Sequence, residues 1–372
     1  MATTSSLLRY GVIGTGMMGV EHIENIRALD DAVVTAISDP HPDSRASGAA
    51  AVGDDHGGPA VFEDHRDLLA SGLCDAVVIA SPNFTHIDVV ADVLATDLHA
   101  MVEKPLCTTV PDCERLLGLE ATRPDGALTW MAMEYRYMPA VAEVVRLVRD
   151  GIVGKPSMVA IREHRFPFLV KVDDWNRFSE NTGGTLVEKT CHFFDLMNLV
   201  LGERPTRVMA SGAQDVNHLD EVYDGRTPDI LDNAFVIVEY PSGARAMLDL
   251  CMFADATDEQ EEMSVVGPLG KVESKMPSNT VHVGVRGRDW IGTVETRTMN
   301  DDRIAHVGLH HGSSYIEHVR FAEAIRTGTA PDVTLTDGYW AVAAGAAAHR
   351  SIELGRPVEL AEMMNTNTEV TR

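Results

Sequence analysis

The sequence predicts an α/β protein of two domains: an N-terminal doubly wound parallel sheet, then an α+β domain with a large open, mostly antiparallel sheet. Three observations lead to this prediction. The chain has 372 residues, which is long for a single hydrophobic core. Short apolar strands alternate with helical patterns up to about residue 134, as in right-handed β–α–β units. Beyond that point comes a run of β-type segments, so we expect domains at 1–134 and 135–372.

The first domain opens with "LLRYGVIGTGMMG", an apolar strand that runs into a glycine turn and a helix at 17–29. "AVVTAISD" follows as a buried strand that ends at Asp39. Further strands are expected at 74–81, 99–104 and 127–135, and further helices at 64–70, 87–95 and 110–120.

The second domain begins with a helix at 139–150 and a strand near 156–164. An irregular segment then leads to "GGTLVEKTCHFFDLMNLVLG" (183–202), which the apolar periodicity predicts to be a helix. Seven β-type segments are expected at 206–213, 232–240, 244–252, 261–267, 270–275, 280–285 and 291–297. Residues 215–230 are polar enough for a loop, and helices at 315–327 and 337–355 close the chain. We expect these helices on one side of the sheet.

Composition excludes several classes of protein. The formal charge of −25 opposes approach to nucleic acid or to an anionic membrane. No apolar run has membrane-spanning length, and the start of the chain lacks the pattern of an export signal. The five cysteines are scattered without a CxxC pair, so we expect a reducing cytoplasm.

"GTGMMG" places Gly14, Gly16 and Gly19 in GxGxxG spacing between a strand and a helix. This spacing is typical of a Rossmann turn, whose backbone and helix N-terminus bind a dinucleotide pyrophosphate. Met17 and Met18 belong to the same turn. The alternative is a plain tight turn, which the strand–helix–strand context disfavours.

Asp39 ends the second strand 20 residues beyond Gly19, where an acid accepts hydrogen bonds from the adenosine ribose hydroxyls and repels a 2′-phosphate. It therefore favours NAD over NADP. Arg45 lies nearby, but Pro40 stands directly after the acid where an arginine is usual for NADP.

Four segments resemble the Gfo/Idh/MocA oxidoreductases in order and spacing: "GVIGTGMMG", "VVIASPNFTH" (77–86), "VEKPL" (102–106) and "GGTLVEKTCHFFDLM". The resemblance extends through "HHGSSYIEHVRFAEAIRTG" and "DGYWAVAAGAAAHRSIELGRPV" near the end of the chain. It implies an NAD(P)-dependent dehydrogenase of sugars or cyclitols, with a Rossmann domain and an open sheet that often joins homodimers or homotetramers.

The resemblance also implies roles for individual residues. Lys104 of "EKP" would lie near the nicotinamide and bind the reacting hydroxyl, and His192 would be the general base. Glu188 stands where the family usually has aspartate, so its contact with substrate is an open question. The residues implied to line the cofactor site are Ser81, Asn83, His86 and Glu103.

The chemistry of alcohol oxidation agrees with these roles. A histidine that titrates near neutrality suits the hydroxyl proton, and an ammonium group stabilises the developing alkoxide. Without the resemblance, His192 would more often be a satisfied core histidine, and Lys104 could be a solvated lysine at a strand end. On one continuous helix Glu188, His192 and Asp195 share a face. We expect Asp195 to be a supporting acid, while Lys189 projects about 100° away and has no assigned role.

A metal site is the tempting alternative. Imidazole and carboxylate ligands could come from Glu188, His192, His164, His310 and His311. The sequence has no HExxH and no thiolate pair, and a lysine can replace a Lewis acid in this chemistry. We therefore expect no metal.

The segment 162–178 is basic in an otherwise acidic chain and precedes the proposed catalytic helix. Its charges could simply pair with neighbouring acids. Alternatively they could bind an anionic sugar, with an aromatic ring packed on the pyranose. Candidate substrate-binding residues are Tyr135, His164, Arg165, Lys171, Trp175, Arg177, His310 and His311.

Three functions follow from these residues. The first is an NAD-dependent dehydrogenase acting on a secondary hydroxyl of a sugar, a sugar derivative or a cyclitol. The second is a redox-neutral glycoside hydrolase that oxidises its substrate transiently, with Glu188 or Tyr135 as an extra acid or base. The third is a non-catalytic NAD-bound sensor, against which the presence of both Lys104 and His192 argues.

Overall fold

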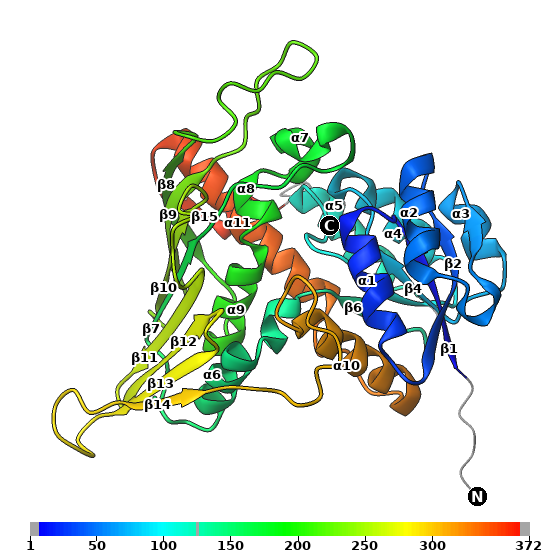
Figure 1. The fold of residues 1–372 in the computed structure, drawn as a ribbon. Helices are drawn as coiled ribbons and strands as arrows, with labels where there is room; N and C mark the ends of the chain where they lie inside the picture. Colours follow the sequence, from blue (N-terminus) through cyan, green and yellow to red (C-terminus); the bar gives the residue numbers. More distant parts are fainter. Residues whose placement is uncertain (1–6, 124–125, 365–372) are drawn as a thin grey trace, which may run out of the picture.

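The structure is a computed structural model that describes residues 7–123 and 126–364. The chain folds into two sheets with helices packed between and around them (Figure 1). Residues 1–6, on which the expectation of no export signal partly rests, lie outside the described residues. In the described part of the chain, no helix combines the length and apolar character needed to cross a bilayer.

The first sheet has six parallel strands in the order β3-β2-β1-β4-β5-β6, as a doubly wound Rossmann sheet requires. Its strands are β1 (Leu8–Ile13), β2 (Ala32–Ser38), β3 (Ala60–Phe62), β4 (Ala76–Ile79), β5 (His99–Val102) and β6 (Thr129–Met131). The central strand β4 is buried at every position, because helices cover both faces of such a sheet. The predicted fold class of this domain is confirmed.

Helices α1 (Met17–Arg27), α2 (Pro42–Val52), α3 (His65–Ala70), α4 (His86–Leu94) and α5 (Val110–Glu120) connect these strands, with short 3-10 turns η1 (Asp55–Gly57) and η2 (Asn83–Thr85). The sequence did not predict α2 or β3. The α2 segment "PDSRASGAAAV" consists mostly of small residues and has no apolar stripe, so periodicity could not reveal it. Strand β3 has three residues, too few for a pattern.

The second sheet has nine strands in the order β14-β13-β12-β11-β7-β10-β9-β8-β15. Its strands are β7 (Met158–His164), β8 (Arg207–Ala213), β9 (Asn233–Glu239), β10 (Arg245–Cys251), β11 (Glu261–Gly267), β12 (Gly270–Met276), β13 (Thr280–Val285), β14 (Glu295–Thr298) and β15 (Val358–Glu359). All pairings are antiparallel except β7 with β10. The expected large, mostly antiparallel sheet is therefore confirmed.

Helices lie on one face of this sheet, as the second domain was expected to have them (Figure 1). They are α6 (Pro139–Arg149), α9 (Cys191–Leu201) and α11 (Leu335–Leu354). Side chains alternate along each strand, so β9 buries Ala234, Val236 and Val238 while Phe235 and Ile237 face outward. The outward face is the open face of the sheet.

The predicted helix at 183–202 is interrupted. The segment forms α8 (Thr185–Glu188) and then α9, with Thr190 at ψ 1° between them, and the short helix α7 (Ser179–Thr182) precedes both. Glu188 and His192 therefore belong to two different helices. The prediction of one continuous helical face was wrong, because apolar periodicity does not report a local change in ψ.

The remaining elements join the domains. Helix α10 (Ser313–Thr327) places Tyr315, Ile316 and Phe321 in the same core cluster as Tyr10 and Val12 of β1. The chain therefore returns to the Rossmann domain late in its course. The other short turns are η3 (Glu134–Tyr137), η4 (Val172–Arg177) and η5 (Leu360–Glu362).

Candidate active site

The glycine turn after β1 has the geometry of a dinucleotide site. Gly14 has φ +87°, and a Cβ there would come within 2.6 Å of the Ser81 backbone nitrogen. A Cβ on Gly19 would come within 2.0 Å of the Gly14 carbonyl, so α1 can pack on the turn only with glycine. A Cβ on Gly16 would meet no described atom within 4 Å. Gly16 therefore presents bare backbone to an open space.

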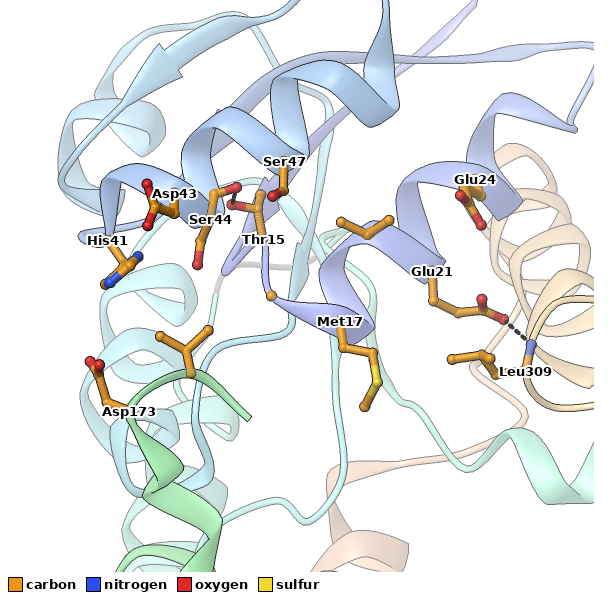
Figure 2. Close-up of a pocket in the computed structure, with 13 residues that line it drawn as sticks. Thr15, Met17, Glu21, Glu24, His41, Asp43, Ser44, Ser47, Asp173 and Leu309 are labelled. Atoms are coloured by element: carbon orange, nitrogen blue, oxygen red, sulfur yellow. Dashed lines mark hydrogen bonds between the residues drawn. The ribbon is translucent and has the colours of Figure 1, made fainter. Parts of the chain in front are cut away.

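That open space is a pocket of about 660 Å³ between the glycine turn and α2 (Figure 2). Its wall includes Thr15, Gly16 and Met17 from the turn, with Leu309 from the loop before α10. Carboxylates on the wall come from Glu21, Glu24, Asp43 and Asp173. Bare backbone at a helix N-terminus beside a roomy pocket fits the pyrophosphate of a dinucleotide.

Asp39 directly follows β2 and contacts two residues that line this pocket. Its carboxylate accepts hydrogen bonds from the backbone nitrogens of Thr15 and His41, both at 2.8 Å. Arg45, which raised the question of NADP, donates to the carbonyls of Asp39 and Pro40 at 2.7 and 2.8 Å. The guanidinium of Arg45 therefore makes its hydrogen bonds to the backbone of its own segment. Met18, the remaining residue predicted on the turn, is half-buried.

The segment after β4 carries three predicted cofactor residues. Ser81 accepts a hydrogen bond from Thr85 at 2.7 Å. The buried ring of His86 bridges the carbonyls of Pro105 and Ser81 at 2.8 and 3.0 Å, which ties this loop to the loop after β5. Burial lowers the pKa of His86. The side chain of Asn83 instead reaches across the domain boundary and donates to the carboxylate of Glu188.

Glu103 and Lys104 follow β5, at the carboxyl edge of the parallel sheet. Glu103 is buried and its Oε1 lies 2.9 Å from Nε2 of His22 on α1. Burial would raise the pKa of this carboxyl, but His22 lowers it to about 2. Glu103 is thus a charged support beneath the lysine.

The Lys104 ammonium crosses to the second domain, where it lies 3.4 Å from the carbonyl oxygen of Glu188. Burial alone would lower the pKa of Lys104, but Glu188 and neighbouring acids raise it above its ordinary value. The lysine therefore keeps its charge in the interior.

Glu188 is 3% exposed and joins three groups. Its Oε1 lies 3.3 Å from Nζ of Lys171, and its Oε2 accepts from Asn83. Burial would raise the pKa of Glu188, yet Lys171 and Lys104 hold it below its ordinary value. The carboxylate is charged and links both domains beside the lysine.

His192, near the start of α9, is 2% exposed and stacks on the ring of Tyr135, with 4.1 Å between centroids and 7° between planes. Its Nε2 lies 3.5 Å from Oε1 of Glu134. Burial lowers the pKa of His192 well below its ordinary value, and the charge of Lys104 lowers it further. The imidazole is consequently neutral and ready to accept a proton.

Lys189, which sequence reasoning left without a role, is an anchor of this site. Its Nζ lies 2.8 Å from Glu163 on β7 and donates to the hydroxyl of Tyr135 at 2.7 Å. Burial lowers the pKa of Lys189. Burial likewise raises the pKa of nearby Glu261 to about 7, with Glu163 adding to the rise. Lys189 is helical at φ −93° and ψ −43° and is 6% exposed, so its ammonium lies inside the protein before the chain turns at Thr190.

Asp195, which was expected to be a supporting acid, is buried in an ion pair. It forms a bidentate ion pair with Arg136, with 2.6 Å between Nε of Arg136 and Oδ2 of Asp195. The Asp195 residue is 1% exposed. This ion pair joins α9 to η3, so Asp195 positions the helix that carries His192.

The basic segment 162–178 is fully paired. The pairs are Arg162–Glu262, His164–Asp249 at 3.1 Å, Arg165–Glu163 at 3.4 Å, Lys171–Glu188 at 3.3 Å and Arg177–Glu221 at 2.9 Å. The alternation of β7 places His164 on the open face, away from His192. Buried Arg177 is tied to the 215–230 loop. Trp175 lies beside Phe84, with 6.3 Å between ring centroids, and the Lys171 ammonium is 4.6 Å from the Trp175 ring centroid.

The two histidines before α10 differ in position. Nε2 of His310 lies 3.8 Å from Oε1 of Glu134, and the ring centroid of His310 is 6.1 Å from that of Tyr135. Burial lowers the pKa of His310 to about 3. Its neighbour His311 has φ 56° and is half-buried. The structure thus brings His310 together with His192.

Within 7–123 and 126–364, Glu21, Glu24 and His306 form the one group of potential metal ligands whose donor atoms lie within 4.8 Å of one another. None of the five residues considered for a metal belongs to it.

Sequence reasoning also missed Glu134. It follows β6 at the carboxyl edge of the parallel sheet, which is where ligands bind, so its position was the available signal.

Comparisons with known proteins identify the family of the chain. The oxidoreductase-family model "NAD-binding Rossmann fold" matches residues 8–126, and the same family's "C-terminal alpha/beta domain" matches 145–360. Myo-inositol 2-dehydrogenase of Thermotoga maritima is 27% identical over 363 residues, covering 96% of this chain and all of the relative.

Two further proteins are informative. The 2,7-anhydro-N-acetylneuraminate hydratase of Escherichia coli is 24% identical over 302 residues, 80% of this chain and 76% of its own. Levoglucosan dehydrogenase, solved with NADH and levoglucosan, has the same fold, with a TM-score of 0.83 over 95% of this chain and 100% of its own at 19% identity. The two family models together span most of the sequence, and the protein belongs to the Gfo/Idh/MocA family of oxidoreductases.

Proposed function

We propose that the protein is an NAD-dependent dehydrogenase that oxidises a secondary hydroxyl of a neutral sugar or cyclitol. The observation that carries this proposal is the meeting of Lys104 and His192 from two domains beside Glu188. They meet at the carboxyl edge of the parallel sheet, where ligands of this fold bind. The likeness to myo-inositol 2-dehydrogenase supports the substrate class.

The chemistry follows from the charge states of the two groups. Neutral His192 accepts the hydroxyl proton as the C–H bond breaks, and charged Lys104 stabilises the developing alkoxide. When bound, the nicotinamide ring supplies the hydride acceptor. Glu188 orients Lys104 from the second domain, and Tyr135 holds the imidazole plane by stacking.

A neutral substrate fits the electrostatics better than an anionic one. Every basic side chain of 162–178 has a carboxylate partner, as set out above, so binding an anion would require breaking an existing pair. Lys104 and Lys189 are likewise next to acids. The hydroxyl groups of a neutral substrate can instead form hydrogen bonds with these charged side chains while the ion pairs stay intact.

Four acids on the pocket wall favour NAD, because a 2′-phosphate would meet like charge, and Asp39 adds to this charge through its hydrogen bonds to the wall residues Thr15 and His41. Arg45 has its hydrogen bonds within the chain and does not line the pocket.

The test is a matrix of purified protein, either NAD or NADP, and paired neutral and anionic substrates such as aldoses with their uronates and cyclitols with their phosphates. We expect NADH formation on neutral members and little activity with NADP. Preference for the uronates or phosphates would overturn the neutral-substrate proposal, and equal use of NADP would overturn the cofactor preference.

A second candidate is a redox-neutral reaction in which the hydride is returned. The likeness to 2,7-anhydro-N-acetylneuraminate hydratase favours it, together with the additional proton-carrying groups Glu134 and Tyr135 beside His192. A dehydrogenase accumulates NADH in step with product. A hydratase or hydrolase converts glycosides or anhydro-sugars without net NADH, which product chromatography would reveal.

A further inference from the structure

Glu134 is a buried carboxyl group with an unusual lack of partners. It begins η3 directly beyond β6 and is 2% exposed. Neither of its carboxyl oxygens makes a hydrogen bond with another residue that the structure describes. Because an unpartnered buried polar group is costly, such a group calls for a functional explanation.

Two imidazole rings converge on the same oxygen of this carboxyl. Nε2 of His192 lies 3.5 Å from Oε1, and Nε2 of His310 lies 3.8 Å from it. The His192 side chain is 2% exposed, whereas that of His310 is 23% exposed. The three groups therefore form a line from the buried base toward solvent.

The proposed reaction needs such a line. A base that accepts a proton from each substrate molecule must release it before the next turnover. The buried His192 cannot keep a proton beside the charges of Lys104 and Lys189. At 2% exposure it also has little direct contact with water.

We propose that Glu134 is a proton-relay residue that takes the proton from Nε2 of His192 on Oε1 and releases it to water beside the partly exposed ring of His310. This inference rests on the proposed dehydrogenase function. In each oxidation the substrate O–H bond breaks and an N–H bond forms on His192, while the C–H electron pair leaves as hydride to the nicotinamide. The proton then moves to the Glu134 carboxylate and from there to water on the His310 side, so one proton is released per hydride transferred.

The charges around Glu134 set the pH at which the relay works. Glu103 and Lys104 face it from the end of β5, Lys189 from the break between α8 and α9, and Glu317 from α10, in addition to the two histidines. Burial and the nearby Glu103 raise the pKa of Glu134 to about 8. Only the ionised carboxylate accepts a proton, so oxidation should accelerate as the pH rises through this value.

The main experiment compares Glu134→Gln with wild type, with Glu317→Gln as the matched control. Glu317 is also a buried acid, and burial raises its pKa well above the ordinary value, but it accepts from Trp130 at 3.2 Å. In wild type we expect the kcat of oxidation to rise with pH to a plateau above about 8. In Glu134→Gln this limb should disappear and kcat should fall by about ten- to a hundredfold, within the range of general acid–base effects. Glu317→Gln should keep the limb.

A second measurement does not require a substrate. In protein carrying ¹⁵N-labelled histidine, the signals of His192 and His310 should shift together near pH 8 in wild type and in Glu317→Gln. The shift should be absent in Glu134→Gln. Unchanged histidine titrations, or a kinetic limb retained in a folded Glu134→Gln protein, would overturn the relay. Absence of any polyol oxidation by wild type, with the coupled titration present, would instead count against the proposed function alone.

Glu134→Ala provides a control for folding. Added formate supplies a carboxylate to the vacated space, and it should restore part of the lost rate in Glu134→Ala but not in Glu134→Gln, where the amide fills the space. Equal effects of formate on both variants would contradict the relay.

Discussion

At the scale of single residues, the site depends on opposite pKa shifts of two buried basic side chains, Lys104 and His192. Lys104 keeps its proton because Glu188 and other acids surround it, whereas His192 loses its proton because burial and the same lysine disfavour a second positive charge. Lys104 is therefore a charged group that can stabilise an anion, whereas His192 is a neutral group that can accept a proton.

Replacing either group should affect chemistry more than cofactor binding. We expect Lys104→Met and His192→Asn each to lower kcat by about 10²- to 10⁴-fold, since each removes a group that acts at the reacting oxygen. NADH affinity, followed by fluorescence titration, should stay within a few-fold of wild type. Lys155→Met, at a side chain that is 72% exposed, is the control.

Near-wild-type turnover in either variant, on a substrate that wild type oxidises, would show that the roles are misassigned. A parallel loss of NADH binding would indicate that Lys104 serves the cofactor rather than the hydroxyl.

Local sequence predicted the motif residues well but not their partners. Gly14, Gly16 and Gly19 could be placed because their spacing is local and the geometry of a glycine turn is general. The contact of Glu134 with His192 joins positions 58 apart, and the pair of Glu163 with Lys189 joins positions 26 apart. Such pairs depend on how strands and helices are assembled, which no local pattern records.

At the scale of elements, the break between α8 and α9 decides which side chains enter the site. On one straight helix, Lys189 would point about 100° away from Glu188. Both residues precede the turn at Thr190 and keep this separation, so Glu188 reaches Lys171 while Lys189 reaches Glu163. The turn changes the direction of α9, which carries His192, relative to both. The strands and most helices could be predicted from periodicity, but this break could not.

The glycine turn yields a prediction that separates folding from cofactor binding. Gly19→Ala should lower the melting temperature, because its Cβ would meet the Gly14 carbonyl at 2.0 Å. Gly16→Ala should leave the melting temperature of the cofactor-free protein unchanged but weaken NADH binding by tenfold or more, because its methyl group would occupy the space into which backbone and pyrophosphate approach.

Gly118→Ala is the matched control, since Gly118 lies on the exposed side of α5 and is not a pocket residue. Calorimetry and NADH titration should show neither effect there. Unchanged NADH affinity in Gly16→Ala would contradict the placement of the pyrophosphate.

At the scale of the whole molecule, the open face of the nine-stranded sheet carries several exposed apolar side chains. Apolar side chains that emerge on it include Phe235, Met158, Met209 and Met247, with exposed fractions of 63%, 58%, 46% and 40%. A regular array of exposed apolar groups on a sheet is typical of an interface between subunits. We propose that this face joins a homodimer or homotetramer.

Sedimentation velocity can test this assembly. We expect wild type to sediment as a dimer or tetramer and Phe235→Glu to shift toward the monomer, because a charge would be buried in an apolar contact. Val61→Glu, at a 49% exposed position on β3 of the other domain, should leave the assembly unchanged. A monomeric wild type at micromolar concentration would exclude the proposal.

Strand β7 contributes side chains both to the active site and to the open face of the sheet. Val159, Ile161 and Glu163 point toward the helices and the lysine of the site, while Arg162 and His164 emerge on the open face. A saturation mutational scan along this strand should therefore alternate in phenotype, with loss of turnover or folding at one position and altered subunit association at the next. Selection could adjust catalysis and quaternary structure separately, although the two sets of side chains are only one peptide unit apart.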